Sequence, residues 1–137
     1  MSDIGAARRA WVWVCITCRA ATDPADAPDA DAPRAGLALA EATAAAAASA
    51  PDISVKRIRC LGNCSRGLSA AIRCDDAWTY VFGGLEPTRD GPSLIVGARL
   101  LAQAEDGIMP WRGRPEPLKR GLIARVPPLD FEEEDQP

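Results

Sequence analysis

The stretch Trp11-Val-Trp-Val-Cys15-Ile-Thr-Cys18 organises this chain, because a short β-prone run delivers two cysteines at its end. A second run, Ile53-Ser-Val-Lys-Arg-Ile-Arg59, also predicts a strand and leads directly into Cys60-Leu-Gly-Asn-Cys64. Between them, residues 36–50 are rich in alanine and leucine and predict a helix that Pro51 ends. Strands joined through a helix run parallel with a right-handed crossover. Both cysteine pairs are therefore expected along the same edge of one sheet.

The second half of the chain predicts a hairpin and a second helix. Residues 68–74 and 77–82 are typical of strands separated by the tight turn Asp75-Asp76, and residues 92–105 predict a helix with one apolar face. The order β-α-β-β-β-α predicts an α/β fold with a mixed four-stranded sheet and two main helices, which is the thioredoxin-like layout.

The domain organisation follows from this order. We assign residues 1–108 to the thioredoxin-like domain and expect residues 1–9 and 20–35 to be mobile, since the second of these is rich in Ala, Asp and Pro. Residues 109–137 carry six prolines and form a C-terminal extension, basic in its first half and acidic at its end. We expect this extension to be extended, with about the last eight residues disordered.

Composition limits the classes of function. The 137 residues fit one domain, and 47% hydrophobic residues suffice for a core, although many of them are alanine. A net charge of −3 gives no general reason to expect a nucleic-acid partner. The apolar run at residues 11–16 is too short for a signal peptide, and no stretch approaches the length of a membrane span. We therefore expect a soluble cytoplasmic protein without a membrane partner.

The cysteines are the residues that indicate metal binding or redox chemistry. In a reducing compartment, clustered cysteines are typical of metal ligands or redox groups rather than structural disulfides. Cys15, Cys18, Cys60 and Cys64 make up a four-thiolate set, the usual ligands of structural zinc or of an iron–sulfur cluster. The chain has no histidine, which excludes mixed Cys–His zinc sites, Cys–His nucleophile pairs and Rieske-type ligation. Cys74 alternates with Ala70 and Ile72 and is expected in the core as a small apolar residue.

A family resemblance narrows these options. The segment Cys60-Leu-Gly-Asn-Cys64-Ser-Arg-Gly67, followed by a strand, a two-residue turn and Trp78-Thr-Tyr-Val-Phe82, resembles the thioredoxin-fold 2Fe–2S ferredoxins over about residues 11–107. The chain is also similar to a family of short bacterial proteins described as predicted metal-binding, which share these motifs and a tail like Trp111-Arg-Gly-Arg-Pro115. In the typical ferredoxins, the first two cysteines lie further apart than Cys15 and Cys18.

The resemblance implies a cofactor and a role. It implies a 2Fe–2S cluster on Cys15, Cys18, Cys60 and Cys64, which serves electron transfer or a cluster-dependent accessory function linked to cobalamin or cobalt metabolism. It further implies a redox or metal-handling protein as partner, and a homodimer. Gly62 and Gly67 would let the backbone curl around the sulfide so that amide N–H groups donate to sulfur.

Other interpretations of the same residues stay open. Four thiolates also suit a structural or trafficking site for zinc or cobalt, and Cys15 with Cys18 matches the spacing of a thiol–disulfide oxidoreductase. Because the chain shows no acid–base or phosphate-binding constellation, an electron carrier or metal-binding accessory is favoured over an enzyme. The three arginines near the cysteines either offset a negative cluster or are solvated surface residues: Arg19, Arg59 and Arg66.

Two aromatic features complete the predictions. Trp78 and Tyr80 alternate along one strand and are expected to form core or to cover the sheet. Trp111, in the basic part of the extension, is expected to fold back as a cap on the domain, with docking to a partner as the alternative.

Overall fold

The computed structural model describes residues 8–17, 34–63 and 66–135. These residues contain a mixed five-stranded sheet and three α-helices. The elements in chain order are β1 (Ala10–Cys15), α1 (Ala35–Ala46), the 3-10 turn η1 (Ala47–Ser49), β2 (Ile53–Ile58), β3 (Ala70–Cys74), β4 (Thr79–Phe82), α2 (Gly91–Gln103), α3 (Glu116–Arg120) and β5 (Leu122–Val126). Within these ranges, none of the helices has the length and apolar character needed to cross a membrane.

The sheet has the strand order β2-β1-β3-β4-β5. β1 and β2 are joined through α1 and run parallel, with Cys15 opposite Ile58, whereas β3, β4 and β5 follow as antiparallel neighbours. The parallel pairing confirms the predicted crossover unit. It also brings the carboxyl end of β1 and the start of the Cys60 loop to one edge of the sheet, as the sequence predicts.

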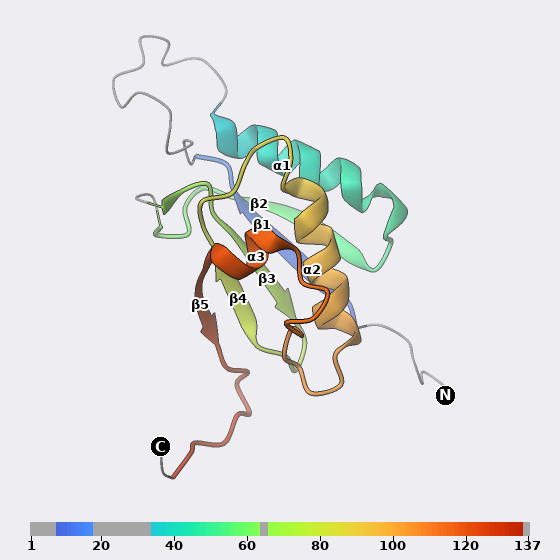
Figure 1. Ribbon diagram of the computed structural model, residues 1–137, viewed down its shortest axis with the longest axis vertical. Coiled ribbons are helices and arrows are strands. Elements are labelled where there is room, and N and C mark those ends of the chain that lie inside the picture. Colours follow the sequence, from blue (N-terminus) through green and yellow to red (C-terminus); the bar gives the residue numbers. More distant parts are fainter. Residues whose placement is uncertain (1–7, 18–33, 64–65, 136–137) are drawn as a thin grey trace.

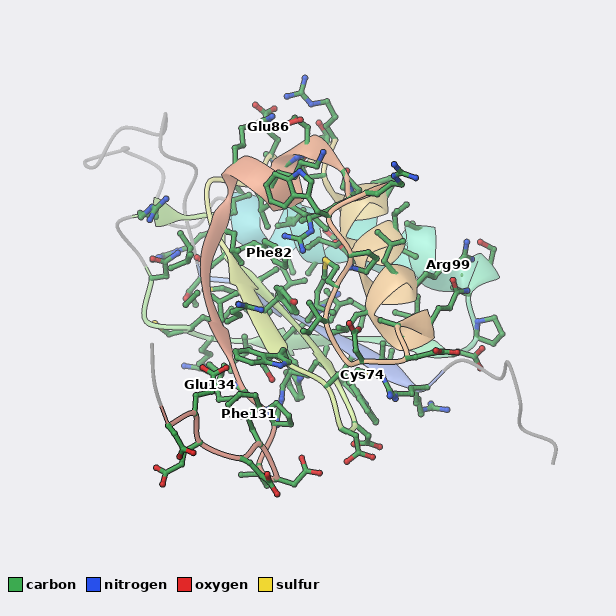
Figure 2. The ribbon with its side chains drawn as sticks, turned by 60° about the horizontal axis from the view of Figure 1, so that its bottom comes forward. Cys74, Phe82, Glu86, Arg99, Phe131 and Glu134 are labelled. Carbon is green, nitrogen blue, oxygen red and sulfur yellow. The ribbon has the colours of Figure 1, made fainter. Side chains whose placement is uncertain are left out.

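All three helices lie on the same face of the sheet, so the molecule has two layers (Figure 1). Alternation along β1 points Val12 and Val14 into the core against α1 and α2, where Ile72 of β3 joins them. Figure 2 places Phe82 of β4 in the interior beneath the helices. On the opposite face, no helix among the described residues covers the strands.

The predicted strands and helices are confirmed within a few residues, but the predicted strand number is wrong. The sheet has five strands rather than four, because β5 pairs antiparallel with β4 and removes that strand's open edge. The C-terminal extension is also not uniformly extended, since it contains α3 and buries Met109 and Leu118 in the core. The boundary at residue 108 stays a prediction, although these contacts tie the extension firmly to the sheet.

The segments predicted to be mobile fall largely outside the described residues. Residues 1–7 and 20–33 are not described. At their borders, the Arg8 guanidinium donates to the carbonyl oxygen of Ala104, 2.8 Å away, and α1 begins at Ala35. The prediction of mobility for residues 1–7 and 20–33 therefore lies outside the described residues, whereas Arg8 and Arg34 are described with defined contacts.

Candidate metal centre

Cys15 stands at the carboxyl end of β1 and is fully buried. Its Sγ lies 3.3 Å from the carbonyl oxygen of Arg59, the residue before Cys60, and 3.6 Å from Thr17 Oγ1. The Thr17 hydroxyl donates to the same Arg59 carbonyl. Parallel pairing of β1 with β2 thus brings Cys15 next to the backbone that leads into Cys60.

The Cys60 loop turns its backbone toward sulfur. Gly62 adopts φ +76°, a conformation that favours glycine, and its amide N–H donates to Cys60 Sγ at 3.2 Å. An N–H donor of this kind stabilises a thiolate, which is the form that binds metal. The Gly62 amide is thus directed at a cysteine sulfur, while the predicted curl of the loop around sulfide stays a prediction, and Cys60 itself is exposed at the surface.

A polar bridge fastens the same loop to β3. Asn63 Nδ2 donates to Ser69 Oγ at 3.0 Å and to the Arg66 carbonyl at 3.4 Å, and Ser69 is completely buried. The sequence analysis noted Asn63 only as part of the Cys60–Cys64 motif and gave its side chain no role. Its side chain closes the loop by replacing hydrogen bonds that the irregular backbone cannot make with itself.

Gly83 is a second residue whose role was missed. The sequence analysis gave Gly83 no role, yet it is buried under the loop, and a Cβ there would lie 2.5 Å from the Arg66 carbonyl oxygen and 2.7 Å from Asn63 Nδ2. The neighbouring Gly84 amide donates to that carbonyl at 2.7 Å. Since only glycine permits this approach, β4 supports the loop from behind. A glycine pair at a strand end was the available signal.

Cationic side chains gather at this edge. Arg59 and Arg66 are exposed beside the loop, and the Arg34 guanidinium donates to the Thr17 carbonyl at 2.8 Å. Arg34 belongs to residues 20–35, which were expected to be mobile, but that contact places it beside the turn that follows Cys15. Positive charge at this position would offset the negative charge of a thiolate-bound metal.

The remaining cysteine lies elsewhere. Cys74 ends β3, and because β1 and β3 are antiparallel it pairs with Ala10, at the opposite end of β1 from Cys15. It is 7% exposed and belongs to the core, as predicted. Burial raises the pKa of the Cys74 thiol, and the nearby Asp75 carboxylate acts in the same direction. Cys74 is therefore placed as a core residue, away from the other described cysteines.

The aromatic predictions have mixed outcomes. Tyr80 is in the core and Trp78 packs against it, as expected. Trp111 is 60% exposed, and its ring centre lies 5.1 Å from the Arg114 guanidinium carbon and 5.0 Å from Lys119 Nζ, so it packs on the buried Arg114 without being buried itself. Arg114, which the sequence analysis did not single out, is only 8% exposed and fills the place beneath this ring.

The arrangement fits a thiolate-bound metal group in its donor chemistry. Two cysteines from different pairs are directed to one edge, and one of them already accepts a backbone N–H. Cys18, Cys64 and Arg19 lie outside the described residues, and the residues that the structure does describe contain no cluster of three or more metal-binding side chains. The four-cysteine set accordingly stays a prediction.

The model of a known protein family matches most of this chain. The model of the DUF1636 family, described as "Protein of unknown function", matches residues 12–128. The chain belongs to the DUF1636 family. The matched region of this DUF1636 chain runs from β1 past β5 and so includes both cysteine pairs and most of the C-terminal extension. No curated protein matches the sequence.

Solved structures define the fold of this DUF1636 chain. A thioredoxin-like [2Fe-2S] ferredoxin from Aquifex aeolicus is similar with a TM-score of 0.55 and 20% identity, covering 91% of this chain and 100% of the ferredoxin. A second structure, of the wild-type thioredoxin-like [2Fe-2S] ferredoxin from that organism, gives a TM-score of 0.54 and 17% identity, covering 86% and 99%. The predicted thioredoxin-like α/β fold is confirmed. At these identities the likeness establishes fold alone.

Proposed function

We propose that this DUF1636 protein binds a 2Fe–2S cluster through Cys15, Cys18, Cys60 and Cys64 and acts as an electron carrier or cluster-dependent accessory. The observation that carries the proposal is the 3.3 Å approach of Cys15 Sγ to the Arg59 carbonyl, because it joins the strand of one pair to the residue before the other. The fold is shared with two structures described as thioredoxin-like [2Fe-2S] ferredoxins, which supports a 2Fe–2S cluster as the bound group.

The bound cluster would supply one-electron transfer. The chain's own residues would set its environment: the Gly62 amide donates to one ligand sulfur, and Asn63 holds the loop in shape. Hydrogen bonds and positive charge near the sulfurs favour the more negative, reduced state and so raise the reduction potential. Arg34, Arg59 and Arg66 supply that charge at this edge.

The exposure of the ligands gives the direction of approach for a partner. Cys15 is sealed in the core, whereas Cys60 is exposed. A redox or metal-handling partner would therefore meet the molecule at the Cys60 loop, where the distance to the cluster is shortest. Cys15 would anchor the group on the protein side and exclude water from it.

Two alternative functions are a zinc or cobalt site and a dithiol oxidoreductase, and the structure disfavours only the second. Four thiolates at this edge also suit zinc or cobalt, and metal analysis separates that alternative from the cluster. A dithiol oxidoreductase needs its attacking cysteine at a helix N-terminus, where the helix dipole lowers the thiol pKa. Here Cys15 lies at the carboxyl end of a strand rather than at the start of a helix, which disfavours Cys15 as such an attacking cysteine.

Serine variants test the ligand set. Protein purified without oxygen, or reconstituted with iron and sulfide, is analysed for iron, acid-labile sulfide and visible absorbance. Cys60→Ser and Cys64→Ser should abolish cluster retention, because each removes a thiolate. Cys74→Ser is the matched control and should retain the cluster while losing some stability. Equal loss from Cys74→Ser, or full retention in Cys60→Ser, would contradict the assignment.

A further inference from the structure

The sheet face opposite the helices carries an apolar hollow of about 440 Å³. Alternation along β1 places Trp13 on this face, since Val12 and Val14 point into the core. Strand pairing sets Ala71 of β3 between Trp13 of β1 and Val81 of β4. The small side chain of Ala71 leaves the space between its two large neighbours, and all three residues line the hollow. Its volume lies in the range of small-molecule binding sites.

The hollow extends to the candidate metal centre. Ile58 and Leu61 belong to its lining. Ile58 pairs with Cys15 across the parallel strands, and Leu61 directly follows Cys60 in the chain. No cysteine lines the hollow, so a molecule bound there would lie beside the metal centre without replacing one of its ligands.

Arg73 is the one charged residue among the described residues that line the hollow. It pairs with Trp11 across β1 and β3, and alternation with the buried Ile72 directs it to the same face as Ala71. Its side chain is exposed and forms no ion pair or hydrogen bond with any described residue. Carboxylates line two neighbouring cavities instead: Asp75, Asp76 and Asp130. The N–H donors of this guanidinium are therefore available to an anion in the hollow.

We propose that the hollow is a binding site for a small aromatic carboxylate. The Arg73 guanidinium pairs with the carboxylate, because its planar fork matches the two oxygens. The aromatic body packs against the Trp13 ring and the aliphatic side chains of Val81 and Val126. Thr79 adds a hydroxyl to the lining. The site does not depend on which metal the cysteines hold.

The charge of the lining favours this ligand class over other occupants. A second copy of the chain, or an apolar segment of another protein, would bury Arg73 on a surface that offers it no carboxylate, which costs free energy. A cationic ligand would meet a charge of its own sign. An apolar molecule with one negative group satisfies both the hollow and Arg73.

Isothermal titration calorimetry of the full chain with 2-naphthoate tests the site. The wild type should bind one 2-naphthoate per chain with a dissociation constant below about 1 mM. The uncharged analogue 2-naphthalenemethanol should bind at least about fivefold more weakly, because it cannot form the charge-assisted pair with Arg73. Octanoate keeps the carboxylate but has no ring to pack on Trp13, so it should also bind more weakly than 2-naphthoate.

Substitutions in the lining separate the two contacts. Arg73→Gln should weaken 2-naphthoate binding at least about fivefold and leave 2-naphthalenemethanol binding unchanged, because only the anion uses the guanidinium. Val126→Glu adds a carboxylate at a 52% exposed position and should weaken 2-naphthoate binding in the same way. Arg99→Gln is the matched control, since Arg99 is an exposed arginine of α2 on the helix side of the sheet (Figure 2), and it should bind like the wild type.

The outcomes that would overturn the proposal are distinct. Absence of saturable heat up to about 1 mM 2-naphthoate would refute the site, and this is the result expected if a second copy or another segment covers the hollow. Equal affinity for 2-naphthoate and 2-naphthalenemethanol, or unchanged 2-naphthoate binding in Arg73→Gln, would refute the role of Arg73. Tighter binding of octanoate would refute the aromatic body. If Arg73→Gln unfolds, as judged by circular dichroism, Val126→Glu decides.

Discussion

Replacing Arg114 by methionine should destabilise the protein strongly although the residue lies in a proline-rich tail segment. Its guanidinium donates from Nη2 to the Met109 carbonyl at 2.6 Å and from Nε to the Pro110 carbonyl at 3.3 Å. It also lies 5.6 Å from the centre of the Tyr80 ring, whose hydroxyl accepts the Met109 amide at 2.9 Å. Arg114 therefore clamps the segment before α3 onto β4.

The magnitude follows from these contacts. A hydrogen bond from a charged donor contributes about 1.5–3 kcal/mol, and a cation over an aromatic ring about 0.5–1 kcal/mol. Burial opposes the charge and lowers the pKa of the Arg114 guanidinium, so the contributions do not add in full. Methionine keeps much of the apolar stem but leaves the carbonyls without a donor. We expect a loss of about 2–4 kcal/mol in the free energy of unfolding.

Thermal unfolding followed by circular dichroism measures this loss. For a chain of this size, the midpoint should fall by about 6–12 °C. Arg112→Met is the matched control, because Arg112 is an exposed arginine of the same segment, and it should change the stability by less than about 0.5 kcal/mol. Equal effects of the two substitutions would refute the reasoning that the Arg114 contacts hold the segment in place.

Two further predictions concern the loop and the core. Gly83→Ala should speed the loss of bound iron and alter the visible spectrum, because the new Cβ would displace the Arg66 carbonyl; an unchanged spectrum and iron half-life would count against this support role. Cys74 has a thiol pKa raised by burial above its ordinary value of 9.0, so its stabilising contribution is complete below that pH and falls as pH rises toward the folded-state pKa. The free energy of unfolding should decline less steeply between about pH 8 and pH 10 in Cys74→Ala than in the wild type, whereas identical slopes would show that Cys74 does not titrate differently on folding.

The local sequence was sufficient to predict those strands and helices that have a characteristic residue pattern and end at a helix- or strand-breaking residue. The β-prone runs at residues 11–14 and 53–59, with the alanine-rich helix between them, predicted a parallel pair of strands, and that pair places Cys15 and the start of the Cys60 loop at one edge. The Gly62 amide on sulfur followed from the need of a tight loop for glycine. These features depend on residues that are close together in the chain, so they could be predicted from the sequence.

Features that depend on distant partners were not predictable. β5 is a five-residue strand between a glycine and two prolines, and it forms because the edge of β4 offers partners for its backbone. Arg114 would ordinarily be placed at the surface, and only two backbone carbonyls and the Tyr80 ring explain its burial. In both cases the deciding contact joins residues that the local pattern does not connect.

Cofactor content is the most direct test of the proposed function. Protein purified without oxygen should be reddish and contain about two irons and two acid-labile sulfides per chain, with visible absorbance that bleaches on reduction. Colourless protein with one zinc per chain, and no uptake of iron and sulfide on reconstitution, would contradict the cluster and leave a zinc site in its place.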